Sequence, residues 1–186
     1  MTAVDELPAG TRTPARRRLL GAGILVPVLY LLLALWLTWE WWTPLGGRLT
    51  SVNEPDTVLF SWLLSWTPHA LAEGRFPLFS DAMNHPAGIN LMWNNGMALP
   101  AVVFAPVTAL FGGVATVTVV TALGFAGSAS TAFWCLRAMD VCALPAALGG
   151  LIFGFSPAMV AQAVGGHPNL VFNVLVPCSC CCPSGS

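Results

Sequence analysis

Long apolar runs alternate with short polar connections along the chain. Residues 19–39 carry no charge, and a helix of this length would span about 31 Å, the thickness of the hydrocarbon layer of a membrane. Residues 114–136 form a second uncharged run. Residues 143–164 form a third, interrupted by two glycines and Pro157. The pattern predicts an all-α integral membrane protein with about three transmembrane helices.

A fourth apolar run, residues 97–112, is too short for a usual crossing and contains two prolines. We expect it to be a re-entrant or interfacial segment. If it does not cross, Arg137 lies in the cytoplasm and His167 lies on the same side of the membrane as Asp56. If it does cross, Arg137 and His167 exchange sides, and the pattern leaves both arrangements open.

The polar stretch between the first two spans predicts an extracytoplasmic loop with juxtamembrane helices. Residues 54–73 are expected to be helical, with Asn53 as a cap and Pro55 in the first turn. Pro68 is expected to break this stretch into two helices suited to the membrane surface. Residues 77–96 are rich in Asn, Pro and Gly, which predicts an ordered loop.

Composition supports the membrane interpretation. Of the 186 residues, 56% are hydrophobic and 8% are charged, whereas soluble domains carry about 25% charged residues. The mean hydropathy is +0.74. A chain this short cannot hide so much apolar surface in one core, so the lipid bilayer is the expected partner. The net charge of −1 indicates no nucleic-acid binding.

Charge placement predicts the orientation. Arginines at positions 16 to 18 flank the first span, so the N-terminus should be cytoplasmic in a multi-pass protein of the cell membrane. Residues 1–18 are polar and expected to be disordered. Residues 40–96 carry few positive charges, which is typical of a loop outside the cytoplasm. A cleaved signal peptide is the alternative for the first span, but the apolar run is longer than such peptides need and ends in TWEWW.

The C-terminal residues 178–186 read CSCCCPSGS. Adjacent cysteines without histidine match no zinc spacing, so no metal ligand set is predicted, although a metal or a disulfide is an alternative interpretation. We hypothesise that this tail is non-native. If the codons are CCC TGC TCC TGC TGC TGC from Pro177 onward, a shifted frame encodes a run of leucines, and the chain is the front of a longer protein interrupted by a frameshift.

Asp56 is the first candidate for chemistry, with Glu54 second. A carboxylate at the edge of a membrane lies in a lower dielectric and can take a proton from an acceptor hydroxyl on the outer face. The structural alternative is that Asp56 only interacts with the dipole of its helix, worth roughly 0.3 to 1 kcal/mol. In a helix the Glu54 and Asp56 side chains point about 160° apart, so both cannot face one substrate.

A second group of candidates could bind substrate. His85, Asn84 and Asn90 lie in MNHPAGIN and could hold sugar hydroxyls or a phosphate, or simply stabilise the loop. His167 lies in the turn GGHPN and could contact a lipid phosphate on the outer face, or have no function. Known nucleotide-binding, hydrolase and metalloprotease motifs are missing from the sequence.

The order of these features resembles the N-terminal part of a GT-C-type polytopic membrane glycosyltransferase of the actinobacterial kind. The resemblance covers residues 19–177. It rests on the arginine-flanked first span, on NEPDTVLFSWLLSW and HALAEGRFPLFSDAMNHPAGINL in the outer loop, and on ALPAVVFAPVTALFGG. A span ending at CLRAMD and the stretch AALGGLIFGFSPAMV before GGHPNL complete it.

The resemblance implies a sugar transferase that uses a polyprenyl-phosphate sugar as donor on the extracytoplasmic face. The acid that acts as base or acceptor-binding group in such enzymes corresponds to Asp56, and some members bind a divalent cation near it. Members are longer and have more spans, so this chain is expected to be an N-terminal fragment that is inactive by itself.

A non-catalytic multi-pass membrane protein, such as a transporter or an assembly subunit, is the alternative. Transporters place ionisable groups within their spans, near the midplane of the bilayer. The predicted spans carry only Thr, Ser and Gln162 as polar groups, while the acids gather in the outer loop. This distribution favours chemistry at the membrane surface over transport.

The predicted orientation can be tested by labelling. A reactive group placed at position 56 should be reached by a membrane-impermeant reagent from outside intact cells, because one crossing separates this loop from the cytoplasmic N-terminus. Residue 5, before the first span, serves as the matched site that should react only after the membrane is opened. Labelling of position 56 only from the cytosolic side would contradict the orientation.

Overall fold

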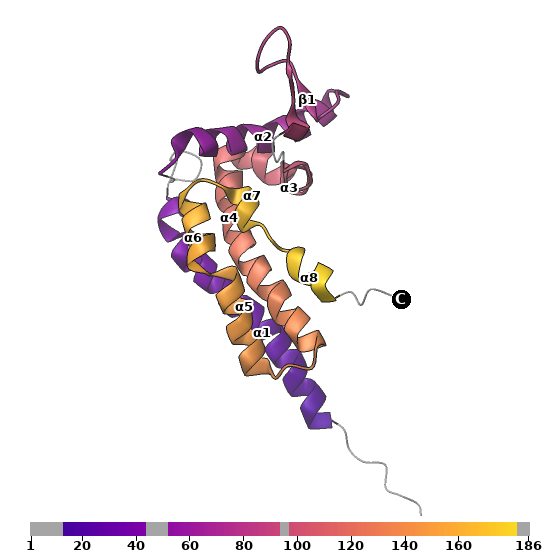
Figure 1. Cartoon of the computed structure of the whole chain (residues 1–186), viewed down its shortest axis with the longest axis vertical. Helices are drawn as coiled ribbons and strands as arrows, with labels where there is room; N and C mark the ends of the chain where they lie inside the picture. Colours follow the sequence, from indigo (N-terminus) through magenta and orange to yellow (C-terminus); the bar gives the residue numbers. More distant parts are fainter. Residues whose placement is uncertain (1–12, 44–51, 94–96, 182–186) are drawn as a thin grey trace, which may run out of the picture.

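The computed structural model describes residues 13–43, 52–93 and 97–181, and it is mostly helical (75%; Figure 1). Its helices and strands are α1 (Thr13–Leu37), η1 (Trp39–Trp42), α2 (Glu54–Ala72), β1 (Phe79–Ser80), β2 (Ile89–Asn90), η2 (Leu91–Trp93), α3 (Ala98–Val103), α4 (Ala105–Ala138), α5 (Ala143–Gly154), α6 (Pro157–Val164), α7 (Pro168–Val171) and α8 (Val176–Cys181). The mostly helical class is confirmed.

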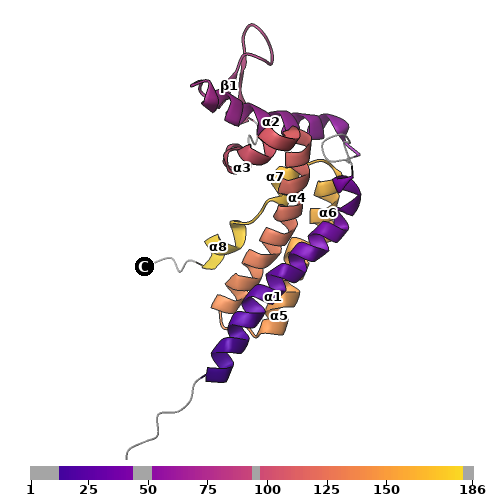
Figure 2. The same ribbon diagram turned by 180° about the vertical axis from the view of Figure 1, so that it is seen from behind.

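Three long helical segments form a bundle, and α2 lies across one end of it. Helices α1, α4 and α5 run side by side, and α6 continues beyond α5 toward the end that carries α2 (Figures 1 and 2). Two segments, Ala105–Ala138 and Ala143–Val164, are long and apolar enough to cross a membrane, and Gly21–Leu37 is a shorter apolar helix. Two of the about three predicted spans are thus long and apolar enough, by length and composition only, and their insertion in a membrane stays a prediction.

The first helix is shifted relative to its predicted bounds. It begins at Thr13, inside the stretch expected to be disordered, and ends at Leu37 instead of at residue 39. Pro14 suits a first helical turn because its φ is already helical and its missing N–H needs no partner there. At the other end the chain tightens into η1, where the indole of Trp42 donates to Thr38 Oγ1 over 2.9 Å.

Residues 97–112 stay at the end of the bundle near α2 and do not run along it. They form α3 and the first part of α4, which changes direction at Gly112, where φ is 84° and ψ is 172°. The Thr108 and Thr116 hydroxyls lie 2.9 Å apart across this kink. The long straight part of α4 therefore begins after Gly112, close to the span predicted for residues 114–136.

Helix α2 is continuous, so the predicted break at Pro68 is wrong. A proline inside a helix removes one backbone hydrogen bond, but packing can compensate for the loss. Phe60, Leu63 and Leu64 before the proline and Ala70 after it are all buried in one apolar cluster. Burial on both sides of Pro68 holds the two halves of α2 in line.

The third apolar run is interrupted at Pro157, as predicted, but its glycines have another role. A Cβ on Gly150 would lie 2.6 Å from the Ala129 carbonyl and 2.7 Å from the Tyr30 hydroxyl. A Cβ on Gly154 would lie 2.5 Å from that of Ala129. These glycines let α5 approach α4 closely, as small residues do in membrane helix pairs.

Two apolar clusters meet on α4. The first joins α1, α4, α5, α6 and α7, and it includes Tyr30, Phe125, Phe133, Met159 and Val171. The second joins α2, α3 and α4 at the end of the bundle, and it includes Phe60, Leu63, Trp66, Met97 and Val120. Because α4 belongs to both clusters, it fixes the position of α2 relative to the α6–α7 segment.

Close packing at Gly150 predicts a position-specific loss of stability. Gly150→Ala should lower the free energy of unfolding by about 1 to 3 kcal/mol, because the added carbon meets backbone that cannot give way. Gly21→Ala is the matched control, since nothing lies within 4 Å of a Cβ at that position. Both variants would be unfolded reversibly in mixed detergent micelles. Equal stability of the two would show that α4 and α5 are not packed this tightly.

Candidate functional site at one end of the bundle

The structure brings together Asp56 and His167, two residues that the sequence analysis selected separately. His167 Nε2 lies 2.9 Å from Asp56 Oδ2, which is a hydrogen bond and, when the histidine is protonated, an ion pair. Their side chains are 32% and 38% exposed, respectively, so both remain open to solvent. The two residues thus share one end of the bundle, which is the arrangement expected if residues 97–112 do not cross.

Asn53 holds the same carboxylate from the other side. Its Nδ2 donates to Asp56 Oδ2 over 2.6 Å. The sequence analysis expected Asn53 to cap α2, but its side chain makes no capping hydrogen bond. The amide N–H₂ donates to the carboxylate three residues ahead, whereas a cap would need the amide oxygen to accept from a backbone N–H. Asn53 belongs to the site and was missed as such.

His167 is positioned by a glycine turn between α6 and α7. The backbone N–H of His167 donates to Gln162 O over 3.0 Å, and Gly166 has a φ of 78°. A left-handed conformation of this kind favours glycine because it has no Cβ. A Cβ on Gly165 would lie 3.0 Å from His167 Nδ1, so this glycine also leaves room for the ring.

A backbone contact joins the same two segments. Val52 N–H, just before α2, donates to Val164 O at the end of α6 over 2.9 Å. Together with the Asp56–His167 hydrogen bond it ties the start of α2 to the α6–α7 turn. The position of the acid is therefore set by segments more than a hundred residues apart, as the separation of 111 residues between the two side chains indicates.

Two buried polar atoms near this turn have no hydrogen-bond partner within the described part of the chain. They are His167 Nδ1 and Asn169 Oδ1. Buried polar groups are nearly always satisfied, so each such atom calls for an explanation. For His167 the Nε2 contact with a carboxylate favours a proton on Nε2, which leaves Nδ1 as an unprotonated acceptor.

Glu54 does not join the pair. It is exposed at the first position of α2, and both Glu54 and Asp56 lie within the first turn of this helix. Because the stretch is helical from Glu54 onward, the two carboxylates point to different sides, as their spacing predicts. Of the two acids selected from the sequence, only Asp56 contacts His167.

His85, Asn84 and Asn90 lie away from Asp56, in the hairpin that projects beyond the far end of α2 (Figure 1). Asn84 Nδ2 donates to Gly88 O over 3.2 Å, and Asn90 Oδ1 accepts from the Met92 backbone over 3.0 Å. These are the contacts that the loop-stabilising alternative predicts. The structure does not bring this group together with the Asp56–His167 pair.

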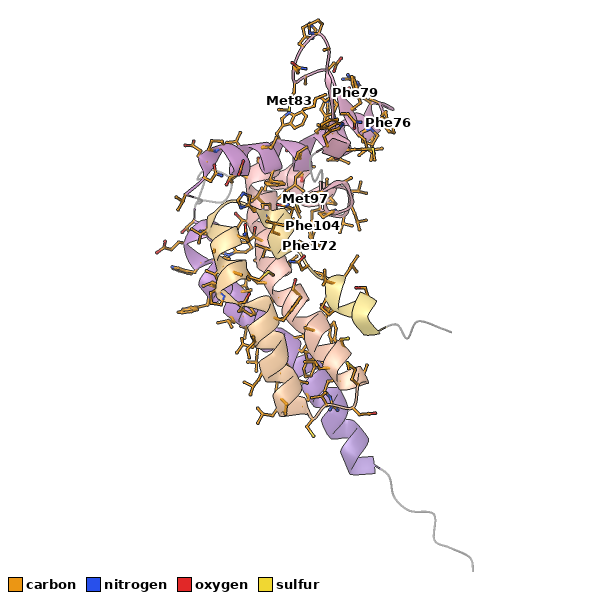
Figure 3. The ribbon with its side chains drawn as sticks, viewed as in Figure 1. Phe76, Phe79, Met83, Met97, Phe104 and Phe172 are labelled. Atoms are coloured by element: carbon orange, nitrogen blue, oxygen red, sulfur yellow. The ribbon has the colours of Figure 1, made fainter. Side chains whose placement is uncertain are left out.

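Charged and aromatic side chains fasten the base of this hairpin. Arg75 donates to Asp81 over 2.6 Å and lies 5.3 Å from the centre of the Trp66 ring. The hydrogen bond from Arg75 lowers the pKa of the Asp81 carboxyl. The side-chain view places Phe76, Phe79 and Met83 together in this region (Figure 3). The hairpin is thus anchored by its own contacts.

Two grooves lie on the surface of the bundle, one near this end and one farther along its length. One, of about 220 Å³, runs between α3 and α7 and is bordered by Met97, Leu99, Asn169, Phe172 and Asn173 among others. The other, of about 360 Å³, lies along α1 and α4 and is almost wholly apolar. Phe172 borders both grooves.

Metal-ligating side chains do not cluster in the described part of the chain. Among them no three His, Cys, Asp or Glu side chains come close enough to share a metal ion. Hard cations such as Mg²⁺ and Ca²⁺ need several oxygen ligands. At Asp56 the Oδ2 atom instead accepts hydrogen bonds from an amide and an imidazole.

Fold and site define a mostly helical bundle with an acid–histidine pair at one end. No protein-family model, no curated protein and no solved structure matches the chain. The interpretation of the site therefore rests on its geometry and on the sequence pattern.

The geometry of the pair predicts a measurable coupling. In a double-mutant cycle, Asp56→Asn and His167→Gln should be non-additive by about 0.5 to 1 kcal/mol, as for partly exposed pairs. The matched control is His69 and Glu73, which lie 3.4 Å apart within one helix and should couple by about 0.3 to 0.5 kcal/mol. Additive effects at Asp56 and His167 would contradict the contact.

Proposed function

We propose that the chain is the N-terminal membrane part of a glycosyltransferase that uses a polyprenyl-phosphate sugar on the extracytoplasmic face. One observation carries the proposal: Asp56 is held at the end of the bundle by His167, at 2.9 Å, and remains open to solvent. An acid that a histidine orients at such a boundary can serve as a general base.

The chemistry assigned to this pair is proton removal from an acceptor hydroxyl. The acceptor oxygen forms a bond to the anomeric carbon of the sugar, its proton passes to Asp56 Oδ1, and the bond from that carbon to the phosphate oxygen breaks. Polyprenyl phosphate leaves with the electron pair of that bond. His167 and Asn53, which hold Oδ2, act as positioning residues that aim Oδ1 at the acceptor.

Exposed apolar faces support placement of the bundle in a membrane. On α1 the side chains of Ile24 and Trp36 are 69% and 73% exposed, and on α5 those of Leu144 and Ile152 are 73% and 71% exposed. Large apolar side chains that are exposed to this extent are unfavourable in water and suit hydrocarbon.

The charges at the two ends support the proposed orientation. The start of α1, which carries the arginine cluster, lies at the same end as the α4–α5 turn next to Arg137 (Figure 1). Asp56 and Glu73, on and just after α2, belong to the opposite end. Arg16 to Arg18 and Arg137 at one end outnumber Arg48 and Arg75 in residues 40–96, which favours a cytoplasmic N-terminus and an external Asp56.

A non-catalytic membrane protein is the second candidate, and one observation favours it. Asp56 Oδ2 accepts two hydrogen bonds, and the two grooves described above are bordered by neither Asp56 nor His167. In that case the pair only ties α2 to the α6–α7 turn, and the chain would belong to a transporter or an assembly subunit.

Sugar transfer by the chain extended through its downstream coding sequence would separate the two candidates. Asp56→Asn should lower the transfer rate about 10²- to 10⁴-fold, the range for loss of a general base, with donor binding retained. Labelled sugar moving from a polyprenyl-phosphate donor to a lipid-linked or cell-wall acceptor is the readout.

Asp140→Asn is the matched control, because it makes the same chemical change at the α4–α5 turn. Asp140 has a φ of 61°, a conformation that Asn also accepts. It should leave the transfer rate unchanged. Full activity of Asp56→Asn would sink the enzyme proposal and leave the tie between helices as the role of the pair.

A further inference from the structure

A small cavity lies where the start of α2, the helix α4 and the α6–α7 turn meet. Its volume is about 10 Å³. It is lined by Thr57 of α2, by Val117, Thr118 and Thr121 of α4, by Ala163 of α6, by Gly166 and Pro168 at the turn, and by Trp41 of η1. All of these residues except Trp41 are buried, so the cavity is largely closed to bulk water.

Two of the lining threonines share one face of α4, because Thr118 and Thr121 are three residues apart. The Thr121 hydroxyl donates to Val117 O over 2.8 Å, and the Thr118 hydroxyl donates to Val114 O over 3.4 Å. A hydroxyl has one proton to donate and two lone pairs that accept. Both threonines thus spend their protons on their own helix and keep acceptor capacity beside the cavity.

Size and chemistry together select the occupant. A cavity needs roughly 10–15 Å³ to admit one water molecule, and cavities that stay dry have apolar walls. This one, at about 10 Å³, has room for a single water and carries three threonines in its wall. A cation is disfavoured there because no carboxylate lines the cavity.

We infer that the cavity binds one water molecule, which donates hydrogen bonds to the Thr118 and Thr121 hydroxyls and contacts Thr57. A water with two protons to donate matches two hydroxyls that have lone pairs to offer. Bridging waters of this kind are part of the structure of a folded protein.

The water borders both segments that carry the acid–histidine pair. Thr57 directly follows Asp56 in α2, and Gly166 and Pro168 stand on either side of His167. By joining these segments to α4, the water helps to fix the backbone beneath the pair. Neither Asp56 nor His167 lines the cavity, so the inference does not depend on the proposed sugar transfer.

Water-edited solid-state NMR tests the inference on the full chain in phosphatidylcholine bilayers, with isotope-labelled threonine. Magnetisation that starts on water should reach the side chains of Thr118 and Thr121 early. Thr67 is the matched reference, because it is 4% exposed, against 5% and 2% for the other two, and does not line the cavity. It should receive the magnetisation late.

Substitutions then identify the groups that hold the water. Thr118→Val keeps the shape of the side chain and removes its hydroxyl, so the early signal at Thr121 should be lost. Thr67→Val is the matched control, since the Thr67 hydroxyl also donates over 3.4 Å to the carbonyl four residues earlier. It should leave the Thr121 signal unchanged. Thr121→Ser retains a hydroxyl and should preserve the early signal at Thr118.

The measurement on the original chain is decisive even if a variant fails to fold. Equally late signals at Thr67, Thr118 and Thr121 would show a dry cavity and overturn the inference. An early Thr121 signal that survives in Thr118→Val would overturn the assigned hydrogen bonds. Its loss in Thr118→Val, with the signals retained in Thr67→Val and Thr121→Ser, would support them. None of these signals requires sugar transfer, so a failure of either proposal is recognised separately.

Discussion

Close approach to α4 is the constraint on which the arrangement of this chain depends. Glycines allow this close approach of both α2 and α5 to α4. A side chain at Gly113 of α4 would collide with Ser61 and Ser65 of α2, and one at Gly150 of α5 would collide with the backbone of α4 at Ala129. Between helices in a membrane such contact replaces the hydrophobic effect as the source of association. α4 therefore acts as the common surface on which α2, α5 and the segment around Val171 are placed.

The Asp56–His167 pair is a consequence of that placement. α2 carries the acid and lies across the end of the bundle, and the α6–α7 turn brings the histidine back to the same end (Figure 1). If α4 and α5 were shifted by one helical turn, about 5.4 Å, the two side chains would lose their hydrogen bond. The geometry of this site therefore depends on how α4 and α5 pack against each other. Neither helix contacts the polar atoms of Asp56 or His167.

Local signals in the sequence were sufficient for much of the fold. The three apolar runs, the helix after Asn53 and the interruption at Pro157 were predicted from periodicity and from proline, whose effects act over one or two turns. Pro68 misled the prediction, because the apolar cluster on both sides of it outweighs one lost hydrogen bond. Asn53 stands at the predicted N-cap position, but its amide N–H₂ donates to a carboxylate three residues ahead and its side chain makes no capping hydrogen bond.

The sequence by itself determined which segments are apolar helices and which side chains could carry chemistry, because composition and spacing are properties of short stretches. Only the tertiary structure decided that Asp56 and His167 meet, and that His85 and the two asparagines near it do not join them. The reason is distance along the chain. A contact across 111 residues depends on how every intervening helix packs, and no periodicity in one segment contains that information.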